Sequence, residues 1–80
     1  MPKRMVHLVF PQRLIKEPVV YRMATKCKVI PNIRRAKVTE TVGEMVLELD
    51  GTAEALEQGV EFLRKTGVDV RPVVNDIVEP

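Results

Sequence analysis

With 80 residues, the chain is long enough for one hydrophobic core, and its 45% hydrophobic and 30% charged residues are typical of a globular protein. Cys27 and His7 are its only cysteine and histidine, which excludes an internal disulfide and a zinc or iron–sulfur site built from Cys and His ligands. The apolar stretch that precedes Pro11 is too short for a membrane span or a signal-peptide core. We therefore expect one stand-alone domain over residues 1–80, soluble and cytoplasmic, without metal or cofactor.

Charge is distributed unevenly along the chain. Residues 1–37 hold ten Lys and Arg against one acid, whereas residues 38–80 hold three Lys and Arg against ten acids. A basic half can indicate a nucleic-acid partner. We favour the other interpretation, in which the fold interleaves the two halves and their charges compensate one another, because net charge bears on association and not on fold.

The first half of the chain predicts a strand, a helix and a second strand. Alternating β-formers over residues 4–10 predict a strand that Pro11 ends. Pro18 suits the first residue of a helix that runs to Cys27 with one apolar face. Residues 32–41 predict the second strand, and the phase of Ile33 against Val38 indicates a β-bulge near positions 34 and 35.

The second half predicts a strand, a helix and a strand. The step from Val42 to Gly43 predicts a tight hairpin turn, and residues 45–49 then alternate as a third strand. Thr52 is a suitable N-cap for a helix that Gly67 ends. A short fourth strand follows over residues 68–72.

This β-α-β-β-α-β order predicts an α+β fold, the ferredoxin-like sandwich, with an antiparallel sheet of strand order 4-1-3-2 and both helices on one face. Strands two and four would be the edge strands. The charged residues of strand two and Pro72 of strand four would protect these edges against aggregation. The helices would lie side by side, so Arg22 and Lys26 of the first are expected to face acids of the second: Glu54, Glu57 or Glu61.

Three segments, in this order and spacing, resemble the NIL domain family. They are Asn-Ile-Arg at 32–34, Gly-Glu-Met-Val-Leu-Glu-Leu-Asp-Gly at 43–51 and Phe-Leu-Arg-Lys-Thr-Gly-Val-Asp-Val at 62–70, and the likeness extends over residues 5–73. The resemblance implies a ferredoxin-like domain of the kind found at the C-terminus of methionine-importer ATPase subunits, where it binds methionine at a paired-domain interface and restrains transport. NIL domains also occur beside ferredoxin modules in proteins linked to sulfur assimilation.

The resemblance also implies a ligand site on the second strand, at Asn32, Ile33, Arg34 and Val38. A carboxamide offers two donors and two acceptor lone pairs, so Asn32 could hold both charged groups of an amino acid; alternatively it satisfies local backbone. Val38 would contact the ligand side chain or belong to the core. The family is named for an Asn-Ile-Leu tripeptide, and Arg34 stands in place of its leucine. Arg34 would either favour a more acidic ligand or close the pocket.

Neither the single histidine nor the single cysteine indicates a reactive site. We expect His7 to be an ordinary surface or interface histidine and Cys27 a buried structural thiol. The chain has no nucleophile elbow, Walker loop or dinucleotide-binding glycine motif, so we do not expect an enzyme.

The first function is a regulatory domain that binds a methionine-like amino acid. The second is a ligand-free dimerisation or adaptor module for a transporter ATPase or a sulfur-assimilation protein, because the chain itself has neither an ATPase nor cluster cysteines. RNA binding is the third and least favoured, because the open sheet face would lack aromatic side chains. We expect a homodimer, since a small core gains from association and Met5, Val9 and Val46 would lie on that open face.

Overall fold

The computed structural model describes residues 2–73 and places the four expected strands and two expected helices in the expected order. The strands are β1 (Lys3–Phe10), β2 (Ile30–Val38), β3 (Gly43–Asp50) and β4 (Asp69–Pro72). The helices are α1 (Val19–Cys27) and α2 (Ala53–Thr66), and a short 3-10 helix, η1 (Gln12–Leu14), follows β1. No helix of residues 2–73 is both long enough and apolar enough to cross a membrane.

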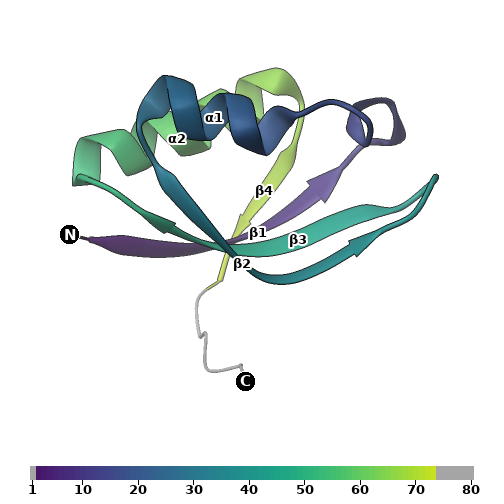
Figure 1. The fold of residues 1–80 in the computed structure, drawn as a ribbon, viewed down its shortest axis with the longest axis horizontal. Helices are drawn as coiled ribbons and strands as arrows, with labels where there is room; N and C mark the ends of the chain where they lie inside the picture. The colour runs from purple at the N-terminus through teal and green to yellow at the C-terminus, as the bar shows by residue number, and fades with distance from the viewer. Residues whose placement is uncertain (1, 74–80) are drawn as a thin grey trace.

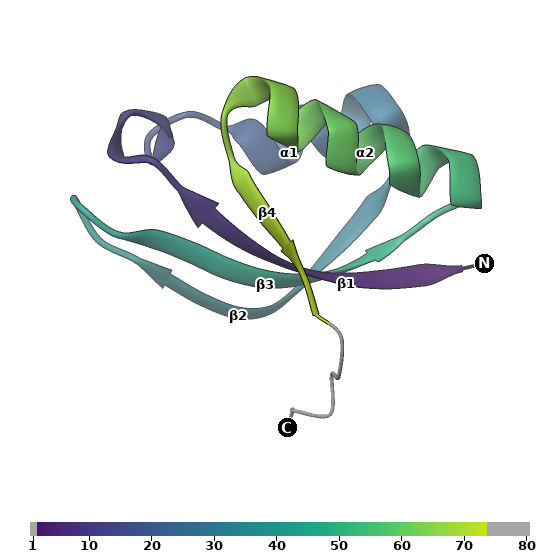
Figure 2. The same cartoon turned by 180° about the vertical axis from the view of Figure 1, so that it is seen from behind.

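The four strands form one antiparallel sheet of order β2-β3-β1-β4, which is the expected 4-1-3-2 order counted from the other edge. Both helices cover the same face of this sheet (Figures 1 and 2). The ferredoxin-like α+β fold is therefore confirmed. We call the face without helices the open face.

The core lies between the helices and the two central strands. Alternate residues of β1 and β3 point toward the helices, and Leu8, Leu47 and Leu49 are fully buried. Met23 of α1 and Leu63 of α2 are likewise fully buried against them. Because side chains alternate along each strand, the remaining residues of β1 and β3 line the open face. The pairing register then assigns each residue of the other strands to one face of the sheet.

The helix ends follow their local chemistry. The Thr52 hydroxyl accepts a hydrogen bond from the Ala55 N–H (3.0 Å) at the start of α2. Gly67 ends that helix with φ of 116°, a conformation that favours glycine. Pro18 takes the N-cap position of α1, so the helix begins at Val19, one residue later than expected.

The bulge in β2 lies where the sequence indicates it, between Ile33 and Arg35. The strand itself begins two residues earlier and ends three residues sooner than residues 32–41. Pro31 is tolerated inside it because β2 is an edge strand, where one backbone N–H needs no partner.

The hairpin that follows β2 is a wider loop than the expected tight turn at Val42 and Gly43. The Thr39 N–H donates to the Val42 carbonyl (2.8 Å), and the Thr39 hydroxyl accepts from the Thr41 and Val42 N–H groups (3.2 and 2.9 Å). The loop is therefore organised by one threonine side chain.

The charge pairing expected between the helices is confirmed only in part: Lys26 lines one groove with Glu57 and Glu61 of α2, but no ion pair joins the two helices within residues 2–73. Arg22 instead contacts Glu17 (3.4 Å), and the Lys26 ammonium lies 6.0 Å from the ring centroid of Phe62. Within residues 2–73 neither forms an ion pair with an acid of α2. The two halves of the chain meet across strands instead, through Lys3–Asp50 (3.9 Å), Arg34–Glu48 (3.6 Å) and His7–Glu44 (2.6 Å).

Two further expectations about burial need correction. Cys27 is only half-buried, at the end of α1. Met5, Val9 and Val46 lie on the open face, as expected, but all three are half-buried by their charged neighbours. The large apolar side chains that are exposed lie elsewhere, mostly on β2 and its hairpin: Tyr21, Ile30, Ile33, Val38 and Val42.

Candidate functional site

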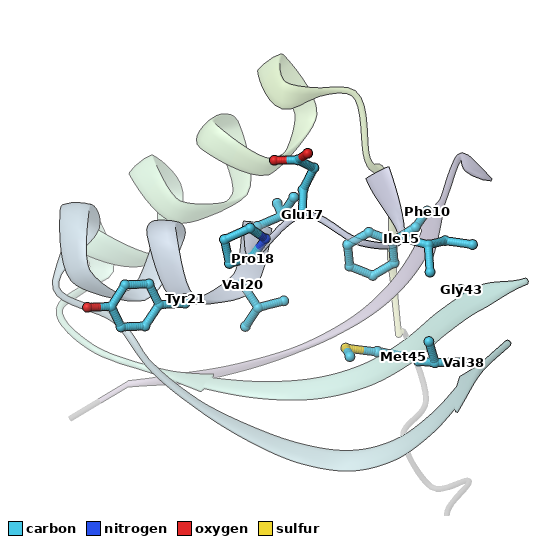
Figure 3. A pocket seen from close by; sticks show the side chains of 10 residues that line it. Phe10, Ile15, Glu17, Pro18, Val20, Tyr21, Val38, Gly43 and Met45 are labelled. Carbon is cyan, nitrogen blue, oxygen red and sulfur yellow. The ribbon is translucent and has the colours of Figure 1, made fainter. Parts of the chain in front are cut away.

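A mostly apolar pocket of about 200 Å³ lies between the start of α1 and the end of the β2–β3 hairpin. Figure 3 shows Met45 and Val38 rising from the sheet toward α1, with Phe10 and Ile15 at one end and Tyr21 at the other. Glu17 supplies the only acidic side chain among the lining residues. The lining is completed by Pro18, Val19, Val20 and Gly43.

Local sequence explains why the pocket has this shape. Pro11 ends β1, so the chain leaves the sheet after Phe10 and returns to α1 through η1 and Ile15. Gly43 allows the hairpin to approach this connection closely. A Cβ atom at position 43 would lie 3.1 Å from both Ile15 Cγ1 and Phe10 Cβ, which is tighter than ordinary packing permits.

The structure separates the expected site residues into two groups. Directly opposite residues in an antiparallel pair share a face. Ile33 pairs with buried Leu47 and so lies on the helix side, whereas Asn32 pairs with Glu48 and lies on the open face. Val38 pairs with Gly43 on the helix side, where it lines the pocket.

Arg34 does not enter the pocket. Its guanidinium lies 3.6 Å from the Glu48 carboxylate, which belongs to the open face. Both side chains remain partly exposed, and such a pair contributes at most about 1 kcal/mol. Of the four expected residues, only Val38 lines this pocket, and all four sit on an exposed edge strand.

Most of the pocket could not be found from the sequence. Phe10, Ile15 and Met45 are apolar residues of three separate segments, and no spacing links them. Tyr21 carried the clearest signal in the sequence, because it is an aromatic residue on the polar side of its helix, and the structure leaves it 69% exposed. An exposed aromatic of this kind commonly belongs to a binding surface.

The remaining groups with chemical potential do not assemble into a catalytic or metal site. His7 Nε2 of β1 lies 2.6 Å from Glu44 Oε2 of the neighbouring strand β3, a partner that the sequence analysis did not identify. Within residues 2–73 no three His, Cys, Asp or Glu side chains are placed to hold a metal ion together. Cys27 lies at the opposite end of α1 from the pocket.

Comparison with known proteins agrees with this architecture. A search of curated protein sequences found no match. Among solved structures, the C-terminal domain of an ABC transporter ATP-binding protein from Enterococcus faecalis superposes with a TM-score of 0.82 at 24% identity, covering 90% of this chain and 84% of that one. Residues 4–72, almost the whole described region, match the sequence model of the NIL domain. The chain therefore belongs to the NIL domain family.

Proposed function

We propose that this domain is a non-catalytic regulatory module that binds a small amino acid with an apolar side chain. The pocket between α1 and the β2–β3 hairpin carries the proposal. Its volume of about 200 Å³ is below the roughly 300 to 1,000 Å³ of sites for larger ligands. Phe10, Val38 and Met45 offer contacts for an apolar side chain. The Glu17 carboxylate contacts the Arg22 guanidinium through Oε1 (3.4 Å), and its other oxygen offers a partner for an ammonium group. Methionine is the first ligand to test because of the family.

We also propose that a second copy of the chain completes the site. Asn32 and Val38 are six residues apart on one strand, about 20 Å, and lie on opposite faces. One small ligand cannot contact both within a single chain. In a twofold antiparallel pairing of β2 with its copy, Ile33 faces Ala36 of the second copy when the axis passes through the bulge. That register matches helix-side residues with helix-side residues and sets Pro31 of the copy opposite Val38, where it would close the pocket, while Asn32 of the copy lies opposite Lys37 on the open face.

The exposed surface of β2 supports this pairing. Ile33 and Val38 are 57% and 54% exposed on the helix side, and a second copy would cover both. Arg34 and Arg35 would approach their counterparts across the seam, which opposes pairing. Because salt screens such repulsion, we expect the dimer to strengthen as ionic strength rises, whereas a dimer held by ion pairs would weaken.

The likeness to a transporter ATPase domain supports a protein partner of the same class. The partner would carry the ATPase, and this domain would report amino-acid supply to it. Reversible binding is sufficient for that role, so we propose no catalysis by this chain. A ligand-free adaptor of the same partner is the alternative, and it predicts an empty pocket at any amino-acid concentration.

Calorimetry with methionine, cysteine and homocysteine tests the proposal. Val38→Glu places a charge in the pocket and should abolish binding, whereas Val42→Glu, a matched change on the 40% exposed hairpin loop, should leave it intact. Asn32→Ala should change binding little, because Asn32 lies on the open face; a loss of about 1 to 3 kcal/mol would mean that the ligand contacts the open face of β2 and not this pocket. Arg34→Leu restores the family residue and should bind at least as well as wild type. No heat from either wild type or Arg34→Leu at millimolar ligand would leave only the adaptor role.

A further inference from the structure

A second feature, far from the pocket described above, lies at the other edge of the sheet. β4 is four residues long and pairs only with Val6 to Val9 of β1. β1 begins three residues earlier, and residues 3–5 pair with β3 on one side only. Within the described chain, no strand residue pairs with them on the β4 side.

Pro72 explains why the ladder stops there. It stands opposite Val6 as the last residue of β4, and a proline has no backbone N–H with which to continue pairing. Among residues 2–73, the backbone of residues 3–5 therefore presents a strand edge about 10 Å long that no strand pairs with on the β4 side. Such an edge is a template onto which another extended chain can add as a strand.

A groove of about 430 Å³ runs beside this edge, between β1, β4 and α2. Three of its lining residues are basic, and none of the lining residues in residues 2–73 is acidic. Its apolar wall includes Val6, Val60 and Val70, each at most 7% exposed. The basic residues are Lys3, Arg4 and Arg64. Figure 2 displays this side of the molecule, with β4 in front of β1 and beneath α2.

Two of the three cations are available to a ligand. The Lys3 ammonium is engaged, at 3.9 Å, with the Asp50 carboxylate on the open face. Arg4 alternates with buried Val6 and so lies on the helix side, as does the groove. Arg64 donates one long hydrogen bond (3.4 Å) to the Val70 carbonyl, which leaves its remaining N–H groups free to bind an anion.

We propose that this groove binds an acidic, extended peptide segment of a protein partner, which adds to β1 as a strand beside residues 3–5. Side chains of such a segment alternate between the two faces of the sheet. Those on the helix side meet Arg4 and Arg64 and are acidic, and those on the open side meet Met5 and are apolar. The recognised pattern is therefore Asp or Glu alternating with an apolar residue.

Fluorescence anisotropy with a short labelled peptide of alternating glutamate and valine tests the proposal. Arg64→Gln and Arg4→Gln should each weaken binding about tenfold, as expected for loss of one charge-assisted hydrogen bond. Lys65→Gln is the matched control, because it removes the same charge from the neighbouring, 76% exposed position of α2 and should change affinity little. Circular dichroism of each variant excludes loss of folding as the cause.

Three outcomes would overturn the proposal. Equal losses from Arg64→Gln and Lys65→Gln would mean general attraction to a basic surface. Undiminished binding of the same peptide with N-methylated alternate amides would exclude strand addition, because such a peptide lacks the backbone donors. Full displacement by inorganic phosphate at equal concentration would indicate a small-anion site in place of a peptide site. Methionine binding at the other site should be unchanged by all three variants.

Discussion

Gly59 controls how closely the two helices approach, and Gly59→Ala measures the importance of that contact. A Cβ atom at position 59 would lie 3.1 Å from Met23 Sδ and 3.3 Å from Val29 Cγ2, and both neighbours are buried. Alanine favours a helix interior over glycine by about 1 kcal/mol. Overpacking a filled core costs about 1 to 3 kcal/mol. We expect the second effect to prevail, with a net loss of about 1 kcal/mol.

Urea and thermal unfolding provide the measurement. For a domain of this size, a loss of about 1 kcal/mol lowers the Tm by roughly 4 to 8 °C. Gly59→Ala should cost less in a Met23→Leu background, because leucine fills similar volume without the sulfur that makes the closest contact. Gln58→Ala, on the exposed side of the same helix, serves as the control. An increase in stability for Gly59→Ala would refute the requirement for glycine at this contact.

Three further substitutions test other parts of the fold by the same unfolding measurements. Thr52→Ala removes the acceptor of the 3.0 Å bond from the Ala55 N–H and should cost about 1 kcal/mol; no change would mean that the cap contributes nothing. Gly67→Ala forces alanine to φ of 116° and should cost about 1 to 2 kcal/mol, so a neutral result would contradict the strain. Leu63→Ala empties a fully buried site and should cost about 2 to 5 kcal/mol, comparable to the whole stability of a small domain, so a folded protein with near-native Tm would contradict its placement in the core.

The fold was accessible from the sequence because each element carries its own signal. Period-two alternation marked β1 and β3, a threonine cap and a terminal glycine marked α2, and the phase change at Ile33 marked the bulge. The misplaced details depend on tertiary context. Pro31 joins β2 only because that strand is an edge, and no local pattern states how far an edge strand extends.

The site was less accessible, for a geometric reason. The family motif places Asn32 and Val38 in one site, but the bulge that the sequence itself indicates sends them to opposite faces, as the observed register confirms. The pocket beside Val38 is assembled from apolar residues of three segments, each of which is ordinary in its own segment. Likewise, Arg22 meets Glu17, which lies five residues earlier just before α1, and the periodic pattern of the helix did not indicate this local partner.

The charge asymmetry of the chain connects the fold with the second groove. Basic residues of the first half meet acidic residues of the second half across the sheet, as Lys3 meets Asp50 and Arg34 meets Glu48. Among residues 2–73 this cross-strand compensation involves two of the ten Lys and Arg of the first half, so it accounts for part of the asymmetry without a nucleic-acid partner. Beside residues 3–5, beyond the end of β4, no strand of residues 2–73 carries compensating acids. The positive charge beside residues 3–5 and the unpaired backbone there thus have the same origin, and an acidic extended segment is the one ligand that satisfies both.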